Sequence, residues 1–343
     1  MRPAPLYLLT EMKAAVLTAL NTLVLDDFRK PGPKAGEVVV RLRAAALNHR
    51  DVWIKSGQYV GLKYPSILGS DGAGYVSDVG AGVESSWVDR EVIINPAFDW
   101  GHHERAQEPK FSILGLPHHG TFAEYVCVPV GQLAPKPPHL SWEEAAALPL
   151  AGLTAFRAVF TRAQLQAHEK VLITGIGAGT ALFALQFAVA AGAVPFVTSS
   201  SPQKLEKAHQ MGARHGTLYT TSGWAKDFGA HYGPFDVIVD SAGGPNFGDL
   251  TDLCNAGGRI VFFGATRGNP HELPMRKIFW KQLTVLGTTM GSPADFSAMT
   301  DFVTKRAIHP VISATYPLEQ LAAAFDLMEA GGQFGKIVIT LPQ

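Results

Sequence analysis

The hydrophobic residues in the first third of the chain recur in short runs that are rich in β-branched side chains. These runs occupy residues 14–17, 37–46 and 72–79. Glycine and proline stand between them, and β-branched runs bounded in this way are typical of short strands. We therefore expect a β-rich, partly open barrel over residues 12–140, preceded by a loose extension over residues 1–11.

The pattern changes from residue 141 onward, where helical stretches alternate with fully apolar runs. The apolar runs lie at residues 171–174, 194–198, 237–239 and 259–263. Strands that alternate with helices predict βαβ units and a doubly wound parallel sheet covered on both faces. After residue 285 the pattern changes again, and it predicts helices near 296–305 and 318–330 and a closing strand over 336–341. The sequence thus predicts an α/β fold with two domains.

Composition narrows the classes of partner. Lys and Arg total 29, as do Asp and Glu, so no basic excess favours nucleic acid or an acidic membrane. Glycines interrupt the uncharged segment between Lys170 and Lys204, and the apolar helix that remains is too short to span a membrane. Two cysteines are too few for a disulfide framework and fit a reducing, cytoplasmic location; we expect Cys127 in a buried strand and Cys254 in a helix. A small molecule is the expected partner.

A glycine-rich turn is the most informative motif. Gly175, Gly177 and Gly179 stand between an apolar strand and a helix, with Ala178 and Thr180 in the same turn. Glycine lets the chain turn sharply and lets a pyrophosphate approach the N-terminus of the helix. A glycine cluster alone also fits a tight turn with close packing, but the βαβ units that follow favour a dinucleotide site.

The end of the next strand predicts which dinucleotide binds. NAD-specific folds place an acid there for the ribose 2′-hydroxyl. This chain has no acid there, but it has Ser199, Ser200 and Lys204, which can bind a 2′-phosphate. We therefore expect NADP(H). The alternative is that Ser201 and Pro202 only begin the following helix.

Several ordered motifs resemble the medium-chain dehydrogenase/reductase superfamily, the group of alcohol dehydrogenases and quinone oxidoreductases. Besides the glycine turn they occupy residues 12–17, 47–51, 65–74, 120–125, 146–155, 236–244 and 335–339. The resemblance implies a GroES-like catalytic domain formed by residues 12–140 and 286–343. It also implies an inserted Rossmann domain over 141–285 that binds NADP(H), with the active site between the two. By the same resemblance we expect a homodimer, with interface strands over 258–264 and 283–290.

Zinc-dependent members of that superfamily carry cysteine and histidine ligands at places where this chain has Asn48, Ser70-Asp71 and Leu150. These residues do not supply the ligands of a tetrahedral catalytic zinc, so we expect no metal there. Histidines 102, 103, 118 and 119 leave another metal site open as an alternative to solvated loop residues.

Without a Lewis acid, the favoured acceptors spread negative charge by conjugation when reduced, as quinones do. The resemblance to quinone oxidoreductases places Asn48 beside the nicotinamide and Asp51, Trp53 and Tyr59 at the pocket. It also implies cofactor contacts from Thr154, Gly264, Ala265, Thr266 and Lys336. Three of these residues also have a structural alternative: a loop tether for Asn48, a core or interface anchor for Trp53, and a helix-packing hydroxyl for Thr154.

The leading hypothesis is a zinc-independent NADPH-dependent quinone oxidoreductase. Three other hypotheses stay open: an enal or enone double-bond reductase, a zinc-type alcohol dehydrogenase, and a non-catalytic NADP(H)-binding sensor. Product analysis separates the quinone oxidoreductase from the double-bond reductase. Tightly bound zinc identifies a zinc-type alcohol dehydrogenase, and NADP(H) binding without turnover identifies a sensor. The physiological substrate and the group that donates a proton are not determined by the sequence.

Overall fold

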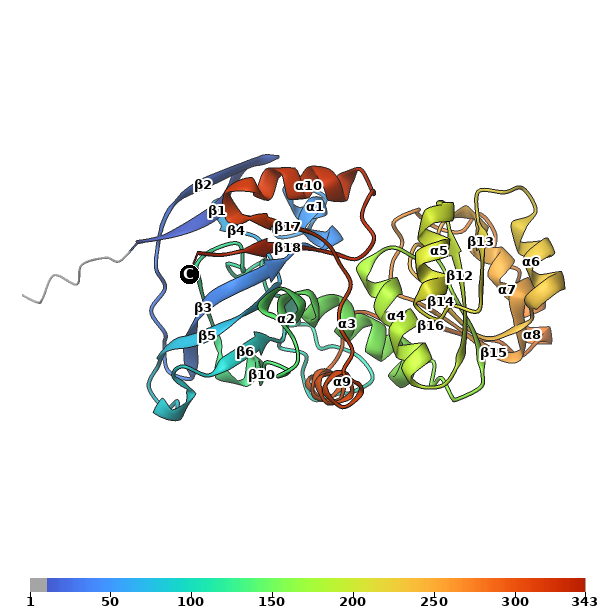
Figure 1. Ribbon diagram of the computed structural model, residues 1–343, viewed down its shortest axis with the longest axis horizontal. Helices are drawn as coiled ribbons and strands as arrows, with labels where there is room; N and C mark the ends of the chain where they lie inside the picture. The colour runs from blue at the N-terminus through green and yellow to red at the C-terminus, as the bar shows by residue number, and fades with distance from the viewer. Residues whose placement is uncertain (1–10, 343) are drawn as a thin grey trace, which may run out of the picture. The chain divides into compact units, whose positions relative to one another are not determined.

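The chain folds into two compact units. The computed structural model describes residues 11–342, so the expected extension over 1–11 lies outside the described residues except for Glu11. The first unit comprises residues 11–149, 312–332 and 336–342, and the second comprises residues 150–311 and 333–335 (Figure 1).

The first unit is rich in antiparallel strands. A sheet of the described residues has the order β10-β6-β5-β3-β18-β17, with β9 also paired to β3; β2-β1-β4 and β7-β8 form two smaller sheets. The strands are β1 (Glu11–Ala19), β2 (Thr22–Arg29), β3 (Glu37–Ala46), β4 (Ser66–Ile67), β5 (Asp71–Val79), β6 (Glu91–Ile94), β7 (Ala97–Phe98), β8 (Ser112–Ile113), β9 (Tyr125–Pro129), β10 (Leu133–Pro135), β17 (Ile312–Pro317) and β18 (Lys336–Thr340). The helices are α1 (His49–Lys55), α2 (Trp142–Ala147) and α10 (Leu321–Glu329), with 3₁₀ turns at Ser85–Trp87, Val130–Gln132 and Leu318–Gln320.

Strand β3 is the centre of this unit. Its run of Val, Leu and Ala suits a strand with neighbours on both sides, and it pairs antiparallel with β5 and β18 (Figure 1). The pairing of Val338 with Ala46 brings the closing strand beside a strand from the start of the chain. The predicted β-rich domain with a contribution from the C-terminal segment is therefore present.

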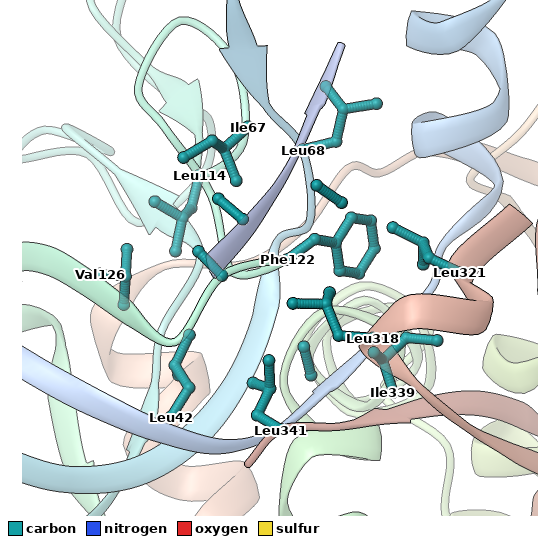
Figure 2. Close-up of a cluster of buried hydrophobic side chains, with 14 of the residues drawn as sticks. Leu42, Ile67, Leu68, Leu114, Phe122, Val126, Leu318, Leu321, Ile339 and Leu341 are labelled. Carbon is teal, nitrogen blue, oxygen red and sulfur yellow. The ribbon is translucent and has the colours of Figure 1, made fainter. Parts of the chain in front are cut away.

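A hydrophobic core cluster of the described residues lies in the first unit. Figure 2 shows Phe122 among Leu318, Leu321 and Ile339, which come from distant parts of the sequence. The Phe122 ring lies 6.2 Å from that of Phe325, edge to face. Burial of these side chains ties α10 to the sheet.

The second unit is built on a parallel sheet of the order β13-β12-β11-β14-β15-β16. Its strands are β11 (Lys170–Ile173), β12 (Val194–Ser199), β13 (His215–Leu218), β14 (Phe235–Asp240), β15 (Cys254–Phe262) and β16 (Thr284–Gly287). Its helices are α3 (Pro149–Phe156), which begins at the unit boundary, a π-helical turn (Arg157–Arg162), α4 (Gly179–Ala190), α5 (Pro202–Gln210), α6 (Trp224–Tyr232), a 3₁₀ turn (Pro245–Asp249), α7 (Leu250–Leu253), α8 (Met275–Trp280) and α9 (Pro293–Arg306). The strand order reverses between β11 and β14, as in the predicted doubly wound fold.

Two segments group differently from the expected domain boundaries. Helix α2, expected in the second domain, lies in the first unit, where Trp142 packs against Tyr75 with ring centroids 4.8 Å apart. Helix α9, expected in the C-terminal part of the first domain, lies in the second unit, where Asp295 forms a buried ion pair with Arg157 and the Phe302 ring lies 6.1 Å from that of Phe156.

The two cysteines differ from expectation in detail. Cys254 begins strand β15 and is buried, so the prediction of a helical residue is wrong; helix α7 ends one residue earlier. Cys127 lies in strand β9 as expected, but it is only partly buried. Burial raises the pKa of both thiols, of Cys127 to about 12 and of Cys254 to about 11, which makes them poor nucleophiles.

Over residues 11–342, each helix is too short or too polar to pass through a bilayer.

Candidate functional site

The glycine turn follows strand β11 directly. Gly175 and Gly177 have φ values of +66° and +121°, which other residues adopt only with strain. A Cβ at Gly177 would lie 2.7 Å from Cδ of Lys204. Helix α4 begins at Gly179, and its N-cap residue Ala178 supplies no side-chain acceptor for the first N–H groups. These open donors, next to glycines that permit close approach, fit the pyrophosphate of a dinucleotide.

The end of strand β12 carries the residues expected to read the 2′-phosphate. Ser199 is buried, and its hydroxyl lies 3.4 Å from the carbonyl oxygen of Ile176 in the glycine turn. Ser200 is exposed. Ser201 begins helix α5, since its Oγ accepts the Lys204 N–H at 3.3 Å. The capping role is thus taken by Ser201, while Lys204 extends across Gly177.

Lys204 is partly buried, and this burial, with the nearby charge of Lys207, lowers its pKa. Both effects work against the ammonium form, so an anion beside Lys204 would be favoured there.

A cavity of about 110 Å³ opens at the carboxyl ends of the parallel strands. At its floor the Thr174 hydroxyl donates to Asp240 Oδ1 at 2.6 Å, and the Gly243 N–H donates to Asp240 Oδ2 at 2.7 Å. Burial raises the pKa of Asp240 in spite of these hydrogen bonds. Tyr219 and Arg267 also line the cavity, with the guanidinium carbon 5.4 Å from the ring centroid.

Tyr219 and Arg267 are not among the residues that the sequence predicts at this site. The rule that ligands bind beyond the carboxyl ends of parallel strands could have found Tyr219, because it directly follows β13. Of the predicted residues after β15, Gly264 packs so closely that a Cβ would lie 2.5 Å from the Ser241 carbonyl oxygen. Ala265 and Thr266 are exposed in the turn that follows.

In the first unit, a buried polar cluster forms around Asn48. Its Nδ2 donates to Asp71 Oδ2 at 2.9 Å, and its Oδ1 accepts from Lys336 Nζ at 2.6 Å. Lys336 Nζ also lies 2.9 Å from Asp71 Oδ2 and 2.8 Å from the carbonyl oxygen of Leu47. The structure therefore brings together three residues that are 23 and 265 positions apart in the sequence.

Asp51 holds the start of helix α1. Its Oδ2 accepts the backbone N–H of Asn48 at 2.8 Å, and its Oδ1 lies 3.4 Å from the Gly69 nitrogen. The side chain is fully buried, and burial raises its pKa to about 6. Burial, with a contribution from the charge of Lys336, lowers the pKa of His49.

The remaining predicted pocket residues lie outside the Asn48 cluster. Arg50 donates to Ser70 Oγ at 2.6 Å and to the Leu114 carbonyl oxygen at 2.8 Å. Tyr59 packs over this guanidinium at 5.2 Å, and the Trp53 ring lies 6.0 Å from that of His49. Ser70 stands at one of the places that were compared with the zinc ligands of the superfamily, and here its hydroxyl binds the Arg50 guanidinium.

Thr154 lies in helix α3 of the second unit. It is 6% exposed, and its hydroxyl donates to the Leu150 carbonyl oxygen at 2.8 Å, one helical turn earlier. This is the helix-packing arrangement that the sequence left as an alternative to a cofactor contact.

Two of the four histidines considered as metal ligands, His118 and His119, have other partners. His119 Nδ1 accepts the Ile67 N–H at 3.2 Å, and its ring lies 5.1 Å from Phe28. The His118 ring lies 5.7 Å from Phe98. Within residues 11–342, His, Cys, Asp and Glu side chains form no group of three or more that could hold a metal ion.

The two units match two family models. Residues 34–138 match the alcohol dehydrogenase GroES-like domain, and residues 179–305 match a family described as zinc-binding dehydrogenase. A crystal structure of an NAD-dependent alcohol dehydrogenase superposes with a TM-score of 0.91 at 38% identity, covering 96% of this chain and 100% of the other.

Curated relatives span nearly the whole chain. The zinc-type alcohol dehydrogenase-like protein YogA of Leptosphaeria maculans is 35% identical, over 93% of this chain and 94% of the relative. The crotonyl-CoA reductase of Streptomyces avermitilis is 30% identical, over 93% and 83%. The quinone oxidoreductase of Rattus norvegicus is 27% identical, over 92% of each. These relatives share a fold and differ in the substrates that their names state.

Proposed function

Because the chain belongs to the medium-chain dehydrogenase/reductase superfamily of nicotinamide-dependent oxidoreductases, we propose that it is a zinc-independent, NADPH-dependent reductase of quinone-type acceptors. The observation that carries the proposal is the buried Lys336 ammonium, which lies 2.6 Å from Asn48 Oδ1 and 2.9 Å from Asp71 Oδ2. Asn48 and Asp71 stand at two of the places where zinc-dependent members bind their metal. A protein cation already satisfies these oxygen atoms, and it would repel a second cation placed beside them.

Without a metal, the protein must rely on positioning and hydrogen bonds to stabilise charge that develops on the acceptor. Bound NADPH supplies the hydride. A conjugated acceptor suits such a site, because its reduced form spreads negative charge over the ring and needs no Lewis acid. The resemblance to quinone oxidoreductases supports quinones as the acceptor class.

The preference for NADPH is supported by the end of strand β12. No acid follows Val197 before Lys204, and the segment carries an exposed Ser200 and a partly buried Lys204. An acid would bind the 2′-hydroxyl of NADH and repel a 2′-phosphate, whereas these groups attract it.

A second candidate function is reduction of a carbon–carbon double bond conjugated to a carbonyl. The observation in its favour is the 30% identity to a crotonyl-CoA reductase over 93% of this chain. The two functions use the same cofactor and the same stabilisation of an oxygen anion. They differ in whether the hydride goes to a quinone or to the β-carbon of a conjugated carbonyl compound, and product analysis tells the two apart.

The test is NADPH consumption by chelator-treated protein with a small quinone, with NADH as the control. Turnover that is retained after chelation and is faster with NADPH supports the proposal. Stoichiometric tightly bound zinc that is required for activity would overturn zinc independence. Turnover with an enone alone favours the double-bond reductase, and NADPH binding without turnover favours a sensor.

We further propose a homodimer that forms through the edge of the second unit's sheet. Strand β16 lies at that edge, and the preceding helix α8 exposes Phe279 by 66% and Trp280 by 82%. An open strand edge beside large apolar side chains favours association. Light scattering tests this, and Trp280→Glu should shift the protein toward monomer; a monomeric wild type would refute it.

A further inference from the structure

Lys336 has no hydrogen-bond donor left for a ligand. An ammonium group carries three N–H donors. Here three acceptors lie within hydrogen-bond distance of Nζ: the Leu47 carbonyl oxygen at 2.8 Å, Asn48 Oδ1 at 2.6 Å and Asp71 Oδ2 at 2.9 Å. Lys336 is 4% exposed, and Asp71 is fully buried. A direct contact from Lys336 to the cofactor would therefore have to break one of these bonds in a buried site.

The two charges determine the orientation of the Asn48 amide. Its oxygen faces an ammonium, which can only donate, and its nitrogen faces a carboxylate. A flip would set N–H groups against the ammonium and a carbonyl oxygen against the carboxylate. The amide nitrogen carries two hydrogens, of which one binds Asp71; the other has no partner among residues 11–342.

We propose that Lys336 is a positioning residue, which acts through Asn48 to present this second N–H to the carbonyl oxygen of the acceptor. The inference rests on the proposed function. When a quinone takes up a hydride from NADPH, an electron pair moves onto a carbonyl oxygen, and the Nδ2 N–H stabilises the negative charge there. A proton from water then completes the hydroquinone. Quinone, NADPH and one proton yield hydroquinone and NADP⁺.

The role differs from that of a plain structural ion pair. Arg50 and Asp51 lie on the same short helix, α1, but other contacts hold their side chains: the Asn48 and Gly69 backbone holds Asp51, and Ser70 and Leu114 hold Arg50. Only the pair of Lys336 and Asp71, among these charges, bonds to the Asn48 side chain. Removing the pair therefore frees the amide to flip while it leaves helix α1 capped by Asp51.

The test removes the pair without leaving a buried charge. Lys336→Met alone would leave the buried Asp71 carboxylate without this ammonium and would strongly destabilise the fold. The double variant Asp71→Asn/Lys336→Met is neutral, and it is compared with Asp71→Asn and with Asn48→Ala. Lys136→Met is the matched control, because Lys136 is also a mostly buried lysine of the first unit, bonded to a backbone carbonyl and to Glu91, but does not contact Asn48.

The first readout needs no turnover. Bound 4-nitrophenol, with NADP⁺ present, reports stabilisation of an oxygen anion by its visible absorbance. We expect its pKa to be lowered in the wild type and in Lys136→Met. The lowering should be lost in Asn48→Ala and in the double variant, with no further change when the three substitutions are combined. A lowered pKa that persists in the double variant would overturn the inference, as would losses that simply add.

The second readout is the division between kcat and Kd. Loss of the oriented N–H should reduce kcat with a quinone by roughly 100- to 1,000-fold and leave the Kd for NADPH unchanged. A raised Kd for NADPH with kcat retained would instead assign Lys336 to cofactor binding and overturn the inference. Failure of the wild type to reduce any quinone would refute the proposed function, whereas the 4-nitrophenol titration would still test the role of Lys336.

Discussion

Removal of the Asp295 carboxylate should destabilise the second unit strongly. Asp295 forms an ion pair with Arg157, and the two side chains are 7% and 2% exposed. The same carboxylate accepts the Thr161 hydroxyl at 2.5 Å and the Ser292 N–H at 2.9 Å, so it also begins helix α9. Asp295→Ala leaves a buried guanidinium without this carboxylate, and breaking a buried pair in this way costs about 3–5 kcal/mol.

The assay is urea unfolding followed by circular dichroism, with hydrogen exchange on peptides from α9 to assign the loss to the second unit. The control is the double variant Arg157→Met/Asp295→Ala. Apolar replacement of a buried pair is often close to neutral, so the double variant should recover much of the loss, less the contribution of the helix cap. A loss below about 1 kcal/mol in Asp295→Ala, as for an exposed pair, would refute the reasoning. A double variant as unstable as the single one would refute it as well.

Three further predictions concern the cofactor site and the Asn48 cluster. Gly177→Ala should raise the Kd for NADPH about tenfold, measured by fluorescence titration. A Cβ there would lie 2.7 Å from the Lys204 side chain at a φ of +121°, and such strain amounts to about 1–3 kcal/mol. Gly131→Ala is the control, because a Cβ at Gly131 meets no atom within 4 Å. Lys204→Ala should lower the ratio of kcat/KM with NADPH to kcat/KM with NADH by roughly tenfold or more, because a charge-assisted hydrogen bond contributes about 1.5–3 kcal/mol. An unchanged ratio in steady-state assays would show that Lys204 does not recognise the 2′-phosphate. Burial raises the pKa of the Asp51 carboxyl from 3.8 to about 6, so between these pH values the folded state holds a proton that the unfolded state releases. Relative to Asp51→Asn, the wild type should therefore lose free energy of unfolding as pH rises from about 4 to about 6, measured by urea titration. A gain in stability over that range would contradict the burial argument.

The sequence predicted what local patterns can encode. The run of Val, Leu and Ala in β3 and the glycine turn after β11 lie within a few residues of where the structure has them. Each depends on neighbouring residues alone: alternation and β-branching for the strand, and positive φ for Gly175 and Gly177.

The Asn48 cluster could not be assembled in the same way. Asn48 and Lys336 were both predicted site residues, but as separate cofactor contacts, and Asp71 was seen only as a position without a metal ligand. Their hydrogen bonds depend on the antiparallel pairing of β18 with β3, which sets the register between distant segments. The position of α9 in the second unit likewise involves contacts between distant residues, such as the ion pair of Arg157 with Asp295 and the packing of Phe302 against Phe156.

The pairing of β18 with β3 has a consequence for biosynthesis. The second unit is almost continuous in sequence, over residues 150–311, so it can fold soon after it leaves the ribosome. The first unit cannot complete its sheet until Lys336–Thr340 has been synthesised, and until then the carboxylate of Asp71 has no ammonium to accompany it into the interior. We expect nascent chains that end before β18 to show a protected second unit and a protease-sensitive first unit, a vulnerable interval in which chaperones would act.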